Sequence, residues 1–381
     1  MNCRSTLVDV AARAHCSKST VSLALRNDPR IPQPTRERVQ ACARELSYRP
    51  DPALACIAAH RWRSRTTPSG SVVAFLTTNH SSNILLDAQA LVGAAAQAEQ
   101  LGYRLEHFRA EDYQTPAQMA RVIQHRGIRG IIVGQLTRED YVFDFPWESF
   151  CAVACSTGFY KPPLHIVMPD HSHAVKRAFT VAHERGYQRI GLVLFDELNA
   201  IDDFDKVSAY LYCQSLLPNQ SNRIPVAHCA PSDGAAFARW YGRHKPDCVL
   251  GLNPLVAWLL KANGVRIPQD VGFVSLMSSL ELKPAGAAVN ATLTTTDHCP
   301  ELLGQTALEQ LDVMLRANRM GPPIQPITMM IEAIWREGCT LPVRNDSPNT
   351  QLRSYRGPGE AQPKVELAGV DQATLSARAA R

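Results

Sequence analysis

Short polar and cationic side chains cluster near the N-terminus of this chain of 381 residues. In sequence order they are Ser17, Lys18, Ser19, Thr20 and Ser22. Hydroxyl groups donate and accept hydrogen bonds, and the Lys18 ammonium adds a positive charge, so the cluster suits the phosphates and base edges of DNA. The alternative is that these side chains form the solvated face of a small helical domain. The elements that position them distinguish the two interpretations.

Three short helices are expected around this cluster. Thr6 can cap the first helix, with Asp9 in the first turn, where the helix dipole favours a negative charge. Ser17 is a suitable N-cap for the second helix, and Pro50 ends the third. We expect the helices to span residues 7–14, 18–26 and about 34–48. The first two, joined by a short break, form a helix-turn-helix, in which the second helix enters the major groove with its N-terminal residues leading.

The distribution of charge favours DNA binding over a plain solvated face. Residues 1–65 contain twelve Lys or Arg against five Asp or Glu, whereas the formal net charge of the whole chain is only +5. The rest of the chain is therefore slightly acidic. A positive field confined to one end of a protein is typical of phosphate contact at that end.

Four motifs of this region make the chain resemble the lactose-repressor (LacI/GalR) family of bacterial transcription regulators. They are TLVDVA at 6–11, SKSTVS at 17–22, TRERV at 35–39 and LSYRP at 46–50. The resemblance implies a homodimer that binds a pseudo-palindromic double-stranded DNA operator and carries a hinge and a two-lobed domain for a small-molecule effector. It also implies the DNA-contacting residues: Thr6, Ser17, Lys18, Ser19, Thr20, Ser22, Asn27 and Tyr48.

Two headpiece positions depart from the family pattern. His15 stands where glycine is usual in the turn, so it must tolerate or avoid a left-handed backbone. Leu23 stands where many members carry arginine, so one guanine-reading side chain is missing. Lys18 and Ser19, which match the specificity-determining pair of the family, therefore become the main candidates for base readout.

The resemblance implies that the following segment is a hinge helix that forms on specific DNA. Two hinge helices, one from each subunit, then push an apolar side chain into the minor groove and kink the duplex. The matching wedge is Ile57, where leucine is usual. Asp51 and Leu54 replace the usual asparagine and alanine, which affects how two hinges would pack. A plain interdomain linker is the alternative.

The remainder of the chain alternates short apolar runs with helical stretches, a pattern that favours parallel sheets with right-handed crossovers. Strands are expected at 71–78, 103–109, 130–134, 151–155, 189–194, near 226, and at 248–252 and 271–276. Helices are expected at 84–101, 116–126, 173–186, 205–217, 234–244 and 254–263. About 275 residues suffice for two lobes. The expected fold is an all-α helix-turn-helix headpiece followed by a two-lobed α/β, periplasmic-binding-protein-like domain with parallel, doubly wound sheets.

We divide the chain into four parts: a headpiece at 1–50, a hinge helix and linker at 51–70, an effector-binding and dimerisation domain at 71–340, and a tail at 341–381. The tail lacks apolar periodicity and leucine heptads, so we expect it to be disordered. The resemblance implies that the chain crosses between the lobes near 168–170, near 293–297 and toward Trp335.

The effector is expected in the cleft between the lobes, because ligands of open α/β sheets bind beyond the carboxyl ends of the strands. The matching positions are Asn79, Ser81, Asp170, Lys206, Asn253 and Ser278. Lys206 replaces a sugar-gripping arginine, and Pro254 and Ser278 replace aspartates. The groups that best pair with vicinal sugar hydroxyls are therefore missing, and no sugar is predicted.

Two interpretations of the cleft stay open. It binds a different small metabolite through Asp170, Asn253 and Trp258, or it is degenerate and the regulator senses no small molecule. A solute-binding protein without DNA function is the runner-up for the whole chain. It would explain the lobes but not residues 6–65.

Catalytic and membrane functions are disfavoured. The chain contains no nucleophile-elbow, zinc-protease, P-loop or dinucleotide-binding motif, so we expect neither an enzyme nor a cofactor. His171 and His173 lack a nearby third ligand, so no metal is expected. The 11 cysteines form no C-x-x-C pair and are expected to be mostly buried thiols, with Cys151 and Cys155 as a less favoured redox or metal pair. Without a signal peptide or a long apolar run, the chain is expected in the bacterial cytoplasm, associated with the nucleoid.

Overall fold

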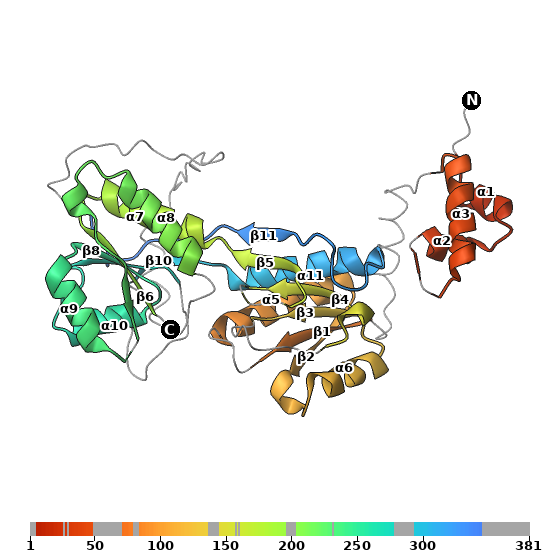
Figure 1. Ribbon diagram of the computed structural model, residues 1–381, viewed down its shortest axis with the longest axis horizontal. Helices are drawn as coiled ribbons and strands as arrows, with labels where there is room; N and C mark the ends of the chain where they lie inside the picture. Colours follow the sequence, from red (N-terminus) through yellow and green to blue (C-terminus); the bar gives the residue numbers. More distant parts are fainter. Residues whose placement is uncertain are drawn as a thin grey trace, which may run out of the picture.

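The computed structural model describes residues 5–25, 27–28, 30–48, 71–78, 84–135, 145–156, 158, 161–195, 203–230, 232–277 and 293–344. These form a helical headpiece and two α/β lobes (Figure 1). The predicted hinge at 51–70 and most of the predicted tail lie outside the described residues. So do four predicted site residues: Ile57, Asn79, Ser81 and Ser278.

Three helices form the headpiece, as predicted. They are α1 (Leu7–Arg13), α2 (Lys18–Leu25) and α3 (Gln33–Glu45). Each contributes one fully buried valine, Val10, Val21 or Val39, to a common core. Because the three helices share such a small core, each of them depends on the other two for burial of its apolar face.

Of the two outcomes open at the turn between α1 and α2, the structure shows a left-handed backbone without glycine. His15 has φ +48°, in the left-handed region. A non-glycine residue pays a steric cost there, so tertiary packing holds this turn rather than local preference.

The first lobe is built on a six-stranded parallel sheet in the order β11-β5-β4-β3-β1-β2. Its strands are β1 (Val72–Thr77), β2 (Arg104–Arg109), β3 (Gly130–Val133), β4 (Cys151–Cys155), β5 (His165–Pro169) and β11 (Thr328–Ile331). Helices α5 (Ile84–Leu101) and α11 (Pro300–Arg316) cover one face, and α6 (Pro116–His125) covers the other. Figure 1 shows these three layers.

The second lobe has a six-stranded sheet in the order β12-β10-β9-β8-β6-β7. Its strands are β6 (Ile190–Phe195), β7 (Ala227–Cys229), β8 (Cys248–Gly251), β9 (Gly272–Ser275), β10 (Thr294–Asp297) and β12 (Ile334–Arg336). Its helices are α7 (His171–Glu184), α8 (Asp203–Ser215), α9 (Gly234–His244) and α10 (Leu255–Ala262). The sheet is parallel, as expected, except at one edge, where β12 pairs antiparallel with β10. The chain enters β12 directly from the first lobe, at the sheet edge where the parallel strands end, so β12 must run in the opposite direction.

The chain passes between the lobes three times, as expected from the resemblance. The passages lie between β5 and α7, between β10 and α11, and between β11 and β12. Helix α11 therefore starts at a passage from the second lobe and packs on the sheet of the first.

Candidate DNA-binding and effector sites

The N-terminal end of α2 presents the polar cluster singled out in the sequence. Ser17 caps the helix: its Oγ accepts a hydrogen bond from the Thr20 amide at 3.1 Å and lies 2.8 Å from the Thr20 Oγ1. Lys18 and Ser19 are exposed. Because Ser17 holds the helix end in place, the ammonium of Lys18 and the hydroxyl of Ser19 project from a fixed position. Such an end can donate hydrogen bonds to guanine or to phosphate oxygens.

The other predicted DNA contacts near α2 have structural roles of their own. Thr6 donates from its amide and its hydroxyl to the Asp9 carboxylate, at 2.7 and 2.8 Å, and so caps α1. These bonds lower the pKa of Asp9. Tyr48 packs its ring against the headpiece core, and Ser22 is half-buried on α2. Lys18 and Ser19 are thus the exposed members of the predicted cluster that follow the cap Ser17 in the first turn of α2.

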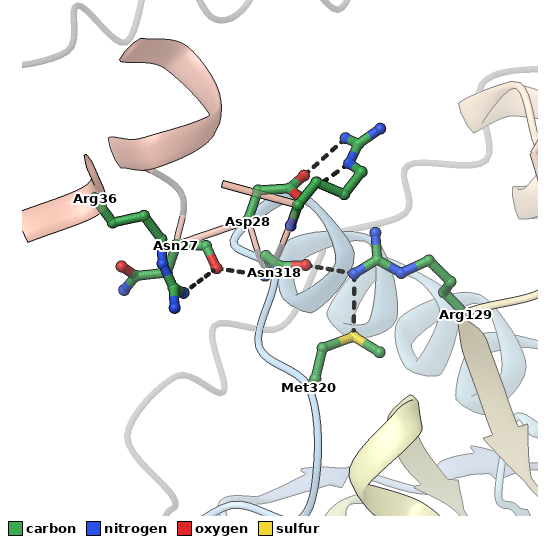
Figure 2. Close-up of polar contacts among 7 residues, drawn as sticks. Asn27, Asp28, Arg36, Arg129, Asn318 and Met320 are labelled. Carbon is green, nitrogen blue, oxygen red and sulfur yellow. Dashed lines mark hydrogen bonds and ion pairs between the residues drawn. The ribbon is translucent and has the colours of Figure 1, made fainter. Parts of the chain in front are cut away.

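Asn27, directly after α2, is held by the protein on several sides. Its backbone carbonyl accepts from Arg36 Nη1 at 3.1 Å and from Asn318 Nδ2 at 2.9 Å, and its Oδ1 accepts from Gln40 Nε2 at 2.7 Å. Figure 2 shows the first two of these contacts. Its φ of +56° is a left-handed conformation that asparagine tolerates better than most residues. Asn27 therefore shapes the turn after α2, the helix predicted to read DNA and called the reading helix below.

The same turn contains a buried carboxylate. Asp28 accepts two hydrogen bonds from the Arg30 guanidinium, at 2.9 and 2.7 Å, and one from the Arg30 amide at 3.0 Å. These bonds, chiefly the side-chain pair with Arg30, lower the pKa of Asp28 to about 2. The turn between α2 and α3 is therefore held by an ion pair, because the Asp28 carboxylate stays ionised at neutral pH.

Three predicted effector residues are described, and two of them accept hydrogen bonds from backbone amides at helix starts of the second lobe. Asp170 follows β5 and accepts from the His173 amide at 2.8 Å at the start of α7. Asn253 follows β8 and accepts from the Leu255 amide at 2.9 Å at the start of α10. Both side chains are half-buried at carboxyl ends of strands, where parallel sheets place ligands.

Lys206 is the third, and it is only 1% exposed. It lies in the first turns of α8, whose start contacts the start of α7, because Ser172 Oγ donates to the Asp205 carbonyl at 3.3 Å. The structure therefore brings the helix starts that carry Asp170 and Lys206 together. Trp258, on α10, is 44% exposed. Asn253 lies at the carboxyl end of β8, which is two strands away from β10 in the second sheet.

Sequence reasoning missed a polar group at the carboxyl edge of the first sheet. Thr78 follows β1, Asp87 lies in the first turn of α5 and Gln135 follows β3. Each of the three residues is less than 5% exposed. Asp87 Oδ1 accepts from the Gln135 amide at 3.2 Å. Its carboxylate also raises the pKa of the buried Cys155, after burial itself. The sequence signal was an acidic residue in the first turn of a helix expected at 84–101.

A second missed feature lies at the lobe passages. His171 at the start of α7 and His298 after β10 are both buried, with ring centroids 5.0 Å apart in an edge-on arrangement. Next to them, Arg336 Nε donates to Asp297 Oδ2 at 2.5 Å. Nothing in local sequence pattern pairs residues more than a hundred positions apart. Only the passages between the lobes bring them together.

Buried thiols account for most of the described cysteines, as predicted. Six of the nine in the described ranges are buried, and none of those nine forms a disulfide. Burial raises the pKa of Cys151 to about 11. Cys151 and Cys155 lie four residues apart on one strand, about 13 Å, which is too far for a disulfide or a shared metal.

The described part of the chain lacks both a metal-ion cluster and a membrane-spanning helix. Within these ranges, no group of three or more His, Cys, Asp or Glu side chains is arranged to hold a metal ion. The helices in the same ranges include none that is both long and apolar enough to cross a membrane.

Two family models match the sequence. Residues 6–51 match the family described as bacterial regulatory proteins, lacI family, and residues 180–339 match the periplasmic binding protein-like domain. Together the matches cover more than half of the chain. The first spans the three headpiece helices, and the second covers most of the second lobe and α11.

Individual relatives agree with these matches. The NTD biosynthesis operon regulator NtdR of Bacillus subtilis (strain 168) is 23% identical over 323 residues, which are 82% of this chain and 93% of that protein. The HTH-type transcriptional repressor CytR of Escherichia coli (strain K12) is 48% identical over 48 residues, 13% of this chain and 14% of its own. Among solved structures, the lac repressor dimer bound to operator and the anti-inducer ONPF shares the fold, with a TM-score of 0.52 and 17% identity over 89% of this chain and all of that one.

Proposed function

Because this chain belongs to the LacI family of bacterial regulatory proteins, it is a DNA-binding transcriptional regulator, and we propose that it acts as a dimeric repressor. In this proposal two headpieces bind the half-sites of a pseudo-palindromic operator, and a small-molecule effector in the cleft between the lobes modulates that binding. The protein then works as a regulator on the nucleoid, in the cytoplasm, and not as an enzyme.

One observation carries the DNA-reading part of the proposal. Lys18 and Ser19 project from the capped N-terminal end of α2, while Val21 of the same helix is fully buried in the headpiece core. A rigid helix whose exposed tip carries hydrogen-bond donors and a positive charge is what major-groove reading requires. We propose Thr6, Ser17, Thr20, Ser22, Asn27 and Tyr48 as supporting contacts and Ile57 as the minor-groove wedge.

The effector part rests on three polar residues at helix starts of the second lobe. Asp170, between β5 of the first sheet and α7, supplies a carboxylate, Asn253 before α10 supplies an amide, and Lys206 in α8 supplies an ammonium. We propose that these residues, with Asn79, Ser81 and Ser278, bind a polar metabolite other than a plain sugar.

Selection of bound duplexes from a random-sequence pool by the full chain tests the DNA-reading part. We expect enrichment of a sequence with two related half-sites, and a particle of two chains per duplex in sedimentation analysis. Enrichment of no sequence at low ionic strength would contradict DNA reading and favour a solute-binding protein.

A thermal-shift screen of carbohydrates, nucleobases and amino-acid derivatives tests the cleft. A ligand that raises the melting temperature should also change the affinity for the selected duplex. Stabilisation by no compound would instead favour the degenerate cleft, in which case the chain would bind DNA without a small-molecule signal.

A further inference from the structure

The turn after the reading helix contacts the first lobe through a residue 291 positions away in the sequence. Asn318 Nδ2 donates to the Asn27 carbonyl at 2.9 Å (Figure 2). Asn27 belongs to the headpiece, and Asn318 follows the last turn of α11. The contact therefore joins the part that reads DNA to the domain that would sense the effector.

The first lobe orients the Asn318 amide toward the headpiece. The Arg129 guanidinium, just before β3, donates to Asn318 Oδ1 and also lies 3.4 Å from Met320 Sδ. Because the amide oxygen faces Arg129, the amide nitrogen faces the opposite direction, toward Asn27. Asn318 has φ +52°, a left-handed conformation that ends the helix and sets the direction of its side chain.

On the headpiece side of the contact, α3 holds Asn27 through two hydrogen bonds. The Asn27 carbonyl already accepts from Arg36, and Gln40 holds the Asn27 side chain, both from α3. A carbonyl oxygen has two lone pairs, and Asn318 takes the second. The neighbouring Asp28 carboxylate also lies close enough to feel the positive charge of Arg129. A hydrogen bond and a charge attraction thus act at the same place.

Helix α11 gives this contact a mechanical connection to the lobe passages. It spans 17 residues, about 25 Å at the usual helical rise, from the end of β10 to the headpiece contact. In Figure 1 it runs from the side of the second lobe toward the headpiece. Its first half is packed so closely on α5 that a Cβ at Gly304 would lie 1.8 Å from the Ala90 carbonyl oxygen. A rotation of the first lobe at the passages would therefore carry α11, and Asn318 beyond its end, with the lobe as one rigid body.

The contact leaves the reading end of α2 accessible. Helix α2 has 8 residues, about 12 Å from end to end. Asn27 lies beyond its C-terminus, whereas Ser17, Lys18 and Ser19 lie at its N-terminus, where Lys18 and Ser19 are exposed. The lobe thus contacts the headpiece at the end opposite to the predicted base contacts.

We propose that Asn318 and Arg129 form a positioning contact through which the first lobe sets the orientation of the reading helix on DNA. The proposal rests on the proposed DNA-reading function. It adds a second connection between lobe and headpiece besides the covalent linker, with α11 as the element that transmits a rearrangement of the lobes. Asn318 and Arg129 contact no base in this mechanism; they act through Asn27.

The test uses the full chain with Asn318→Gly and Asn318→Asp. Glycine keeps the left-handed backbone without strain and removes the amide, and aspartate keeps the shape and the Arg129 contact but cannot donate to the Asn27 carbonyl. Lys245→Gly is the matched control, because Lys245 also ends a helix with a left-handed φ of +44° but belongs to α9 of the second lobe.

Three measurements are made on each variant. Hydrogen exchange without DNA reports the contact itself, and we expect faster exchange of the amides in residues 24–31 for both Asn318 variants but not for the control. Binding to the selected duplex should weaken about 5- to 10-fold, the loss of one hydrogen bond of ordinary strength. Insertion of one base pair between the half-sites should then penalise the variants less than the unmodified chain, since their headpieces are less constrained.

Unchanged exchange in both Asn318 variants would overturn the proposal. Unchanged DNA binding would also overturn it. So would tighter DNA binding, which would indicate that the contact holds the headpiece away from DNA. If the unmodified chain shows no sequence preference, the DNA-reading function fails instead. The exchange experiment still reports separately whether the headpiece contacts the lobe.

Discussion

At the scale of single residues, headpiece side chains divide into those that hold the fold and those left to contact a ligand. Thr6 and Ser17 serve as helix caps, Asn27 and Asp28 build a turn, and Lys18 is exposed. Caps fix the backbone amides at helix ends, which lets the next side chain project in a constant direction. The specificity of the headpiece should therefore depend most on Lys18 and its neighbour Ser19.

Replacement of Lys18 by alanine tests this division. We expect the affinity for the selected duplex to fall about 10- to 100-fold, because a direct contact to a base edge contributes about 1–3 kcal/mol. Preference at one base pair of each half-site should be lost. Lys261→Ala, an exposed lysine on α10, is the control and should change neither. A uniform loss across all DNA sequences would show that Lys18 contacts only phosphate.

Asp28 makes the stability of the headpiece depend on acid. Its pKa of about 2 in the folded protein lies below the usual value of about 3.9 for an unfolded chain, so its contribution is complete above about pH 4. The contribution is lost as the pH falls through about 2. We expect Asp28→Asn to speed hydrogen exchange in α2 and α3 at neutral pH, and the difference from the unmodified chain to shrink between pH 4 and pH 2.

Asp270→Asn controls for the charge change. The Arg266 guanidinium likewise lowers the pKa of Asp270 to about 2, but Asp270 belongs to the second lobe. Headpiece exchange should not respond to it at any pH. A difference between Asp28→Asn and the unmodified chain that stays constant down to pH 2 would mean that the ion pair with Arg30 is not its source.

At the scale of elements, α5 and α11 form the closest contact in the first lobe that the described residues show. Their backbones meet at Gly93 and Gly304, where added Cβ atoms would lie 1.9 Å from the Glu301 carbonyl oxygen and 1.8 Å from that of Ala90. Only glycine permits such an approach, because there is no room for a Cβ between the two backbones and both helices are packed on the same sheet. This crossing is what makes α11 follow the first lobe.

Gly304→Ala should therefore destabilise the first lobe by about 3 kcal/mol, at the upper end of overpacking costs. Gly242→Ala in α9 is the matched control, because a Cβ there meets no atom within 4 Å and alanine favours the helix. That change should stabilise slightly, by about 0.5–1 kcal/mol. Thermal unfolding followed by circular dichroism measures both. Equal melting temperatures of the two variants would show that the helices separate easily.

Most elements agree with the sequence analysis because their apolar spacing is strong. Helices α5 and α9 and strand β4 have the predicted bounds. Helix α11 and strands β5, β10, β11 and β12 were not predicted as elements. Strands β11 and β12 are 4 and 3 residues long and half exposed, so they carry little apolar signal, and their pairing partners lie far away in sequence.

At the scale of the whole molecule, positive charge is concentrated in the first 65 residues, while the two lobes carry the bulk of the chain. Such a protein is expected to bind DNA through counterion release at one end only. A dimer would present two such ends at a fixed separation. Both expectations follow from the arrangement of the parts and not from any single residue.

Deletion of one half-site from the selected duplex tests the paired arrangement. We expect the affinity of the dimer for DNA to fall at least 100-fold. With two half-sites, the first bound headpiece holds the second one at a high effective concentration near its own half-site, and this effect is lost with a single half-site. The logarithm of affinity should fall linearly with the logarithm of salt concentration, and the slope should be roughly halved for the single half-site. A scrambled half-site of equal length controls for duplex length. Equal affinity for one and two half-sites would contradict a dimeric reader.

Local pattern was sufficient for the headpiece and for the two-lobed architecture. Caps, turn residues and helical or strand periodicity are properties of neighbouring residues, so Thr6, Ser17, Val21 and the parallel strands could be inferred from the chain alone. The tertiary structure decided the remainder: the antiparallel edge of β12, the His171–His298 pair and the hydrogen bond from Asn318 to Asn27. Each joins residues far apart in sequence. Their proximity depends on how the chain passes between the lobes, and no short-range preference encodes that.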